Sequence, residues 1–214
     1  MALFAKPRGE PQVRQPAQPG FSELGCPAFA GLVEAMHARE EKTDPKFGIL
    51  DLAKASGNHI QFFSQFRCKY HIGDVLDAME SWPVPGEDTP VVDLETLLPL
   101  HNTDGLDLIL AWDGLNYLHP ELLPLLSGHL AGKCNPGAWL HAFVYTRGDM
   151  PALPLRFDIF SPEKMRCTRR GDDWVGAPCP PQRVLESRLP EFRVVQSRLL
   201  QNGLHEYLFQ VNRH

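Results

Sequence analysis

The chain has 214 residues, 43% of them hydrophobic and 22% charged, which is typical of a globular protein with a full hydrophobic core. Its net charge of −5 argues against a broad electrostatic grip on nucleic acid, because that needs a basic surface. Five scattered cysteines without a CxxC pair indicate neither a disulfide framework nor a metal site. With no apolar run long enough to span a membrane, we expect a cytoplasmic protein.

The first 20 residues contain four prolines and few apolar side chains, and we expect them to form a flexible tail. Residues 21–214 then form a single domain. Its first predicted element is an amphipathic helix, because Phe29, Leu32, Val33 and Met36 recur near helical spacing.

The most informative segment is residues 47–63, which reads as a buried strand, a turn of small residues and a helix. The strand ends near Asp51, and Asn58 is the expected N-cap of the helix. The turn consists of Ala53, Ala55, Ser56 and Gly57. Such a turn brings free backbone N–H groups to the mouth of a sheet, where α/β proteins bind nucleotide-like cofactors.

Further strands are predicted at 68–72, 90–93, 106–112 and 137–145, with a helix over 120–130 that has Pro120 in its first turn. Strands that alternate with helices indicate a mostly parallel, doubly wound sheet. The chain ends differently, with strands at 192–200 and 204–211 joined at Asn202-Gly203, a strong signal for a hairpin. The final strand is therefore antiparallel to the sheet.

In this order, the segments resemble the class I S-adenosylmethionine-dependent methyltransferases over residues 25 to 212. The motifs are the acid-ended strand and turn at 51–57, the acid after the second strand, the 93–99 segment, the strand and loop at 106–118, the Pro136-Gly137 turn and the terminal hairpin. The resemblance implies a Rossmann-like α/β/α fold in three layers, with a doubly wound, mostly parallel seven-stranded sheet and an antiparallel C-terminal strand. It also implies S-adenosylmethionine as cofactor.

The cofactor-binding residues that the resemblance implies are Asp51, Ala53, Ala55, Ser56, Gly57, Asp74, Asp93, Leu94 and Trp112. Asp74 is expected to accept both ribose hydroxyls, Asp93 and Leu94 to lie on the adenine side, and Trp112 to flank the adenine. Two glycines of the family's turn are Ala53 and Ala55 here. Asp51 could instead order the turn, and Trp112 could belong to the core.

The resemblance implies methyl transfer to an unidentified acceptor: small molecule, protein side chain and RNA all remain open, and the acidic net charge favours the first two over RNA. It singles out no general base among Asp113, Tyr117, His119 and His141. Residues 146–180 are long for a connection and could form a substrate lid, a surface flap or an oligomer contact.

Two alternatives compete with this hypothesis. A methyltransferase-like module that has lost catalysis and serves in binding or regulation would explain the two alanines. An NAD(P)-dependent oxidoreductase would share the strand, turn and helix, although the antiparallel ending favours the methyltransferase fold.

Overall fold

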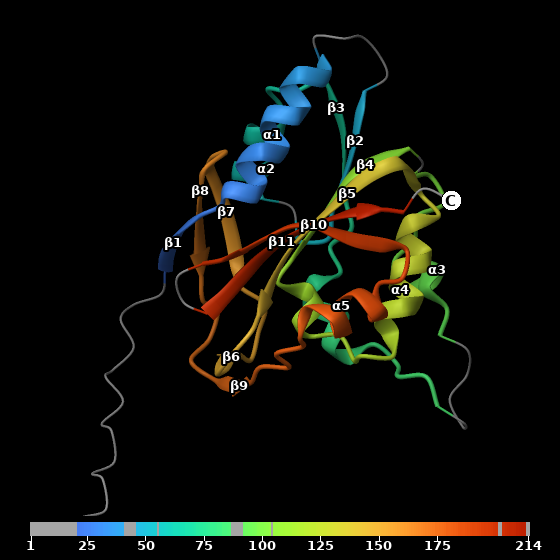
Figure 1. The fold of residues 1–214 in the computed structure, drawn as a ribbon, viewed down its shortest axis with the longest axis vertical. Helices are drawn as coiled ribbons and strands as arrows, with labels where there is room; N and C mark the ends of the chain where they lie inside the picture. The colour runs from blue at the N-terminus through green and yellow to red at the C-terminus, as the bar shows by residue number, and fades with distance from the viewer. Residues whose placement is uncertain are drawn as a thin grey trace, which may run out of the picture.

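A computed structural model describes residues 21–40, 46–54, 56–86, 92–103, 105–200 and 203–212. The predicted tail, residues 1–20, lies outside these ranges, as do Ala55 and Asn202. The central element is a six-stranded sheet in the order β10-β11-β5-β4-β2-β3 (Figure 1). The strands are β2 (Phe47–Asp51), β3 (Cys68–Ile72), β4 (Leu106–Trp112), β5 (Cys134–Tyr145), β10 (Phe192–Leu199) and β11 (Leu204–Val211).

The sheet is mostly parallel and doubly wound. β3, β2, β4 and β5 pair in parallel, whereas β11 runs antiparallel to both β5 and β10. From β2 the chain moves outward to β3, then returns to β4 on the other side of β2, so the strand order reverses between β2 and β4. Crevices at the carboxyl ends of strands at such a reversal are the usual ligand sites of open α/β sheets.

Helices cover both faces of the sheet, which gives the expected three layers (Figure 1). One face carries α1 (Pro27–Glu40) and α2 (Gly57–Phe63), and the other carries α3 (Leu94–Leu97), α4 (Leu122–Ala131) and α5 (Gln182–Arg188). Two short 3-10 segments, η1 (Leu76–Ser81) and η2 (Gly114–Asn116), follow β3 and β4. β4 is buried along its whole length, as its aliphatic sequence predicts.

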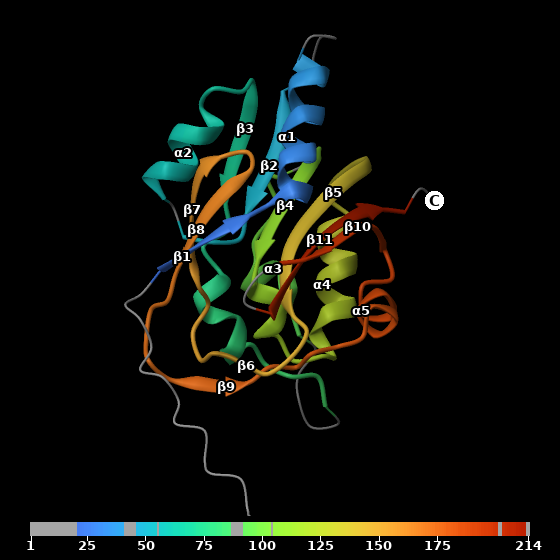
Figure 2. The ribbon, with the colours of Figure 1, turned by 60° about the vertical axis from the view of Figure 1, so that its left-hand side comes forward.

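The sequence did not indicate a second, antiparallel sheet in the order β1-β8-β7. β1 (Phe21–Gly25) precedes α1, while β7 (Arg156–Ser161) and β8 (Lys164–Thr168) form a hairpin within the 146–180 segment. β6 (Asp149–Pro151) and β9 (Trp174–Gly176) pair at the base of this segment. Figure 2 shows the β7–β8 hairpin beside β1 and α2, so segments from distant parts of the chain build one layer.

Three predicted details need correction. The main sheet has six strands among the described residues rather than seven, because Val92 and Asp93 are not in a strand; Pro90 and Val91 lie outside the described ranges. α2 begins at Gly57 with Ser56 as N-cap, so Asn58 is a helical residue. α4 begins at Leu122, so Pro120 precedes the helix instead of occupying its first turn.

The two predicted turn glycines both adopt the left-handed conformation. Gly137 has φ +81°, but it lies within β5, which begins at Cys134 and has a register shift against β4 at this point. Gly203 has φ +80°, and Leu200 N–H donates to Leu204 O, which closes the β10–β11 hairpin. Glycine meets little steric resistance to this conformation, which explains why glycine occupies both positions.

One buried carboxylate, that of Glu206, fixes α1 and the sheet to each other. Glu206 of β11 accepts hydrogen bonds from Ala28 N and Phe29 N at 3.0 and 2.9 Å, and it also contacts His141 Nε2 at 2.9 Å. A carboxylate at the first N–H groups of α1 satisfies donors that have no partner inside the helix. This contact ties the start of α1 to the antiparallel strand.

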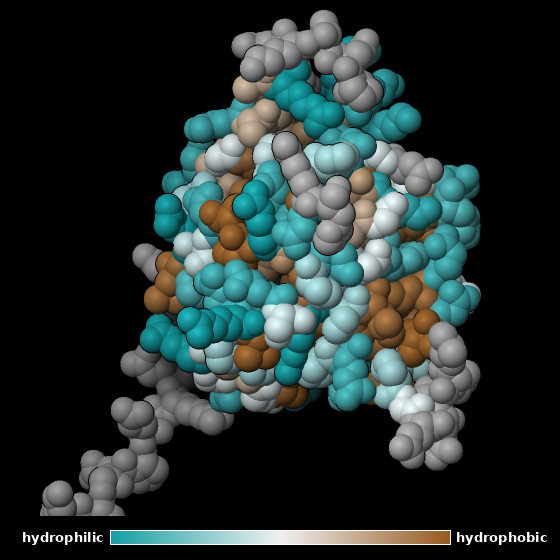
Figure 3. All heavy atoms as spheres, turned by 45° about the vertical axis from the view of Figure 1, so that its right-hand side comes forward, coloured by the Kyte–Doolittle hydropathy of each residue, from teal (hydrophilic) through white to brown (hydrophobic). Residues whose placement is uncertain are grey.

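Figure 3 shows a face that is mostly hydrophilic with separate apolar patches. Leu125 of α4 is among the large hydrophobic side chains that remain exposed. Within the described residues, every helix is too short or too polar to cross a membrane.

Candidate functional site

Asp51, at the end of β2, is the centre of a buried hydrogen-bond network. Its carboxylate accepts hydrogen bonds from Ala53 N at 2.8 Å, from Trp112 Nε1 at 2.6 Å and from the Tyr70 hydroxyl. His59 Nδ1 lies 2.9 Å from Oδ2 of the same carboxylate. Burial and the neighbouring Asp51 raise the pKa of Tyr70, so its hydroxyl stays protonated and donates. Four donors thus surround one carboxylate.

His59 links this network to the hairpin. Its Nε2 lies 3.0 Å from the backbone oxygen of Phe157 in β7, so both ring nitrogens face acceptors. The ring thus bridges the Asp51 carboxylate and the backbone of β7. The side chains of both residues are 2% exposed, so this pair is shielded from water.

Trp112 is part of a stack of rings that fills the space beyond Asp51. Its indole is fully buried and stacks on His59 at 4.8 Å and on Phe157 at 5.1 Å between ring centroids. Phe143 of β5 continues the stack from Phe157 at 4.9 Å. Trp112 also has φ +50°, which is uncommon for a bulky residue and places its ring between β2 and the hairpin. The tryptophan is therefore a packed residue that holds Asp51.

Ala53, which stands where the family's turn has a glycine, causes no backbone strain in the turn after β2. Among the described residues, the non-glycine positions with positive φ are Asp74, Trp112 and Cys179, so Ala53 has an ordinary backbone conformation. Ser56 is 8% exposed, and its Oγ is buried without a hydrogen-bond partner among the described residues. A buried hydroxyl without a partner costs free energy, so a ligand that supplies one would be favoured there.

A cavity of about 430 Å³ opens over this turn at the carboxyl ends of β2 and β3. Its wall comes from the β2–α2 turn, from η1 and from the hairpin segment. The lining residues are Ala53, Lys54, Ser56, His59, Leu76, Asp77, Leu155, Arg156, Phe157 and Arg170. Arg170 Nη1 is 2.5 Å from Asp77 Oδ1, an ion pair that closes one side of the cavity. The volume lies within the ~300–1,000 Å³ of small-molecule sites.

Side chains of α2 and of the loop after β4 hold the 146–180 segment in place over the cavity. Tyr117 donates through its hydroxyl to Pro151 O and Leu153 O, both at 3.0 Å, and Leu155 N donates to Asp113 Oδ2 at 2.9 Å. Asn58 Nδ2 donates to Asp158 Oδ1 at 2.9 Å. The segment is therefore fixed by α2 and by the loop after β4.

Asp113 is fully buried, and its second oxygen, Oδ1, has no hydrogen-bond partner among the described residues. Burial raises the pKa of this carboxyl to about 7, because removal from water disfavours the charged form. Neither Asp113 nor any of the other three candidate bases lines the cavity. Tyr117 holds the hairpin segment, His141 is buried against Glu206, and His119 precedes α4. None is placed against a ligand in the cavity.

The remaining expected cofactor residues are spread over the carboxyl edge of the sheet. Asp74 follows β3, is exposed and has φ +50°; it does not line the cavity, whereas Asp77 does. Gly57 is the exposed first residue of α2. Asp93 is the N-cap of α3 and accepts from Glu95 N and from the Thr96 hydroxyl, and Leu94 is buried beside it. The structure thus brings together Asp51, Ala53, Ser56 and Trp112.

Sequence reasoning missed His59, Tyr70, Asp77 and Arg170. His59 follows Asp51 by eight residues, so a helix that folds back over the strand could have suggested their contact. Tyr70 lies in β3, which pairs with β2, and the parallel register gave some indication of that contact. Arg170 and Asp77 are 93 residues apart, and no local pattern joins them. Among the described residues, no group of three His, Cys, Asp or Glu side chains could hold a metal ion.

No family model and no curated protein matches the chain. Several solved structures are similar to it over most of its length. A Burkholderia thailandensis 1,6-didemethyltoxoflavin-N1-methyltransferase, determined with S-adenosylhomocysteine, is 15% identical, with a TM-score of 0.46 and coverage of 87% of this chain and 79% of that one. An S-adenosylmethionine-dependent methyltransferase of Clostridium acetobutylicum is 10% identical, with a TM-score of 0.46 and coverage of 86% and 91%. Streptomyces venezuelae DesVI is 12% identical, with a TM-score of 0.46 and coverage of 87% and 91%. The similarities are distant, and the order and directions of the strands carry the description of the fold as a doubly wound α/β sheet.

Proposed function

We propose that this chain binds S-adenosylmethionine in the 430 Å³ cavity and is a methyltransferase that acts on a small molecule or a protein. The observation that carries the proposal is the position of the cavity, at the carboxyl end of β2 beside the reversal of strand order.

The residues that line the cavity fit the chemistry of this cofactor. Ser56 Oγ, buried and without a described partner, can hydrogen bond to a polar group of the ligand. Asp77 can accept ribose hydroxyls, the role that the family resemblance implies for Asp74. Lys54 and Arg156 offer positive charge to the carboxylate of the methionine moiety, while Leu76 and Phe157 offer apolar surface to the adenine.

The work left to the protein in this reaction is to position the acceptor and exclude water. When bound, the cofactor supplies an activated methyl group on its sulfonium. The hairpin segment that Tyr117 and Asp113 hold in place covers the cavity and can exclude water from it. An acceptor that loses a proton would need a base, and the described residues place none of the predicted bases against the cavity.

A second candidate function is ligand binding without catalysis, and one observation favours it. The carboxylate of Asp51 is already surrounded by four donors, and the ring stack of Trp112 fills the adjoining space. A carboxylate in this state has little capacity left for a cofactor or an acceptor. The chain would then use the bound cofactor as a signal or a structural element.

Calorimetric titration with S-adenosylhomocysteine tests the binding site, and a methyl-transfer assay with candidate acceptors separates the two functions. Ser56→Leu should abolish binding because the added side chain extends into the cavity. The matched control is Ser64→Leu, at the exposed C-cap of α2, which should leave binding unchanged. Binding without transfer to any acceptor supports the second function. No binding at millimolar ligand would contradict both.

A further inference from the structure

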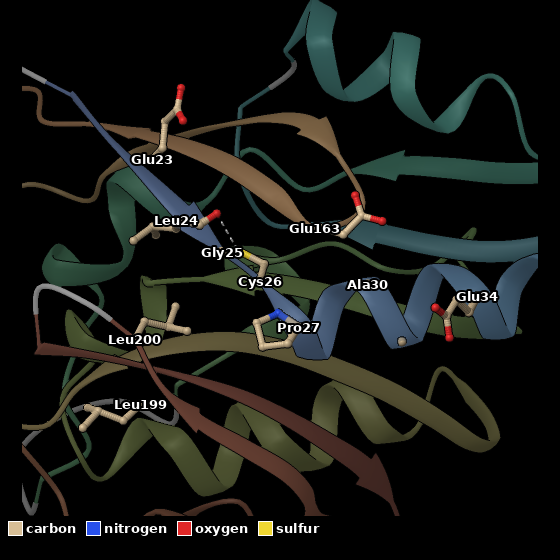
Figure 4. A pocket seen from close by; sticks show the side chains of 11 residues that line it. Glu23, Leu24, Gly25, Cys26, Pro27, Ala30, Glu34, Glu163, Leu199 and Leu200 are labelled. Atoms are coloured by element: carbon tan, nitrogen blue, oxygen red, sulfur yellow. Dashed lines mark hydrogen bonds between the residues drawn. The ribbon is translucent and has the colours of Figure 1, made fainter.

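A second cavity, of about 650 Å³, lies where β1, the start of α1, the β7–β8 turn and the end of β10 meet. The β7–β8 hairpin contributes to both this cavity and the proposed cofactor site. The other elements that line this cavity do not line the cofactor site. Figure 4 shows Pro27 and Cys26 in its centre, with Leu199 and Leu200 to one side and Glu34 and Glu163 to the other.

The cavity combines an apolar floor with three carboxylates. The apolar residues are Leu24, Cys26, Pro27, Ala30, Leu199 and Leu200, and the acidic residues are Glu23, Glu34 and Glu163. Among the described residues, no lysine, arginine or histidine lines it. Glu163 accepts a hydrogen bond from the Ser161 hydroxyl at 2.8 Å, which does not neutralise its charge. The occupant that this surface fits is a cationic segment with some apolar side chains.

We infer that this cavity is the docking site of the chain's own first 20 residues, whose basic side chains pair with its three carboxylates. That segment carries Lys6, Arg8 and Arg14 against the single acid Glu10, in a chain whose net charge is −5. It also contains Leu3 and Phe4, which match the apolar floor. The segment itself lies outside the described residues.

The connection between segment and cavity makes this contact easy to form. Residue 20 directly precedes β1, and Glu23 to Pro27 belong to the wall of the cavity. Arg14 is seven residues before Phe21, a length that spans up to about 23 Å, whereas β1 spans about 17 Å. Pro19-Gly20 is typical of a turn that reverses the chain.

Attachment also offsets weak affinity. A segment that is covalently attached close to its site has an effective concentration of about a millimolar there. Each exposed ion pair is weak. Three of them together with the apolar contacts fill the cavity half of the time if their combined dissociation constant is about a millimolar. Because the charges are exposed, salt should weaken the contact.

Carbodiimide cross-linking of the full chain tests the inference, because it joins the Lys6 amine to a carboxylate that it contacts. Mass spectrometry of digested protein should find Lys6 joined to Glu34 or Glu163 within one chain, and less so at roughly 0.5 M salt. Glu23→Gln leaves both reacting carboxylates in place but removes one charge, and should lower the yield about two- to five-fold. The matched control is Glu121→Gln, an exposed acid on α4's N-terminal side, which should leave the yield unchanged.

Three outcomes would overturn the inference. Lys6 could react equally with exposed acids outside the cavity, such as Glu121 and Asp172. The two variants could give the same yield. A mixture of ¹⁴N- and ¹⁵N-labelled protein could show that the links join two chains, in which case the occupant is a second copy. None of these outcomes depends on binding of S-adenosylhomocysteine, so the inference can fail while the proposed function holds.

Discussion

The indole Nε1 of Trp112 donates a 2.6 Å hydrogen bond to Oδ1 of Asp51 and so joins the carboxyl end of β4 to that of β2. Both side chains are buried, and the bond crosses the point where the strand order reverses. Trp112 therefore has a structural role. It holds Asp51 beside the proposed cofactor cavity but does not itself line that cavity.

Trp112→Phe should therefore lower stability without weakening ligand binding. The change removes one donor from a buried carboxylate and part of a packed ring, at a cost of about 2–4 kcal/mol in the free energy of unfolding. Denaturant unfolding measures this loss. Trp174→Phe is the matched control, because Trp174 is 49% exposed and should change stability by less than about 1 kcal/mol. Equal effects of the two changes would contradict the role of Trp112.

Ala53→Gly should raise neither the stability of the protein nor its affinity for the cofactor. Ala53 is not among the described residues with positive φ, so glycine relieves no strain there and loosens the unfolded chain. We expect a loss of about 0.5–1 kcal/mol in stability and an affinity for S-adenosylhomocysteine within about two-fold of the wild type. A gain of roughly ten-fold or more in affinity would show that the Ala53 methyl group obstructs the cofactor.

The charge of Asp113 should make stability depend on pH. Its pKa is raised to about 7 in the folded protein, above its ordinary value of 3.8, so the folded state binds the proton more tightly than the unfolded state. The contribution of this group to stability is present below about pH 4 and is lost as the pH rises through about 7. Relative to Asp113→Asn, the wild type should lose roughly 2–4 kcal/mol between about pH 4 and pH 8.

Denaturant unfolding of both proteins over this pH range checks the prediction. An asparagine in place of Asp113 does not titrate, while its carbonyl oxygen can still accept from Leu155 N, so the difference isolates the charge. Parallel pH profiles for the two proteins would show that Asp113 is not the buried acid described here.

Tyr117→Phe should loosen the hairpin segment. The hydroxyl donates to two backbone oxygens, of Pro151 and Leu153, and its loss leaves both without this partner. Hydrogen exchange of amides in residues 149–160 should become several-fold faster, which corresponds to about 1–2 kcal/mol of local stability. Tyr145→Phe, a change at a buried tyrosine of β5, is the control, because among the described residues it is the Tyr117 hydroxyl and not that of Tyr145 that donates to Pro151 and Leu153. If both variants exchange alike, Tyr117 does not hold the segment.

Much of the main sheet could be predicted because local patterns determine it. The aliphatic run of β4 and the Asn-Gly signal before β11 each reflect a short stretch of chain, and both elements formed where expected. The short segment at residues 90–93 had too few apolar residues to specify a strand by itself. β1 was missed because its partner, β8, lies about 140 residues later in the chain.

The site was harder to predict than the fold. The sequence located Asp51, Ala53, Ser56 and Trp112 at one edge but left Trp112 open between an adenine contact and the core, and the structure hydrogen-bonds its indole to Asp51. The ion pair of Arg170 with Asp77 and the cover of β7 over α2 depend on the path of the 146–180 segment, which periodicity does not reveal. Whether Asp74 or Asp77 faces a ligand likewise depends on the bend after β3.

The most direct measurement is a crystal structure of the full chain with S-adenosylhomocysteine at saturating concentration. We expect the ligand in the 430 Å³ cavity, against Ser56 and Asp77, with the hydrogen bond between Asp51 and Trp112 intact. A ligand at any other site, or none at millimolar concentration, would contradict the proposal that this cavity binds the cofactor.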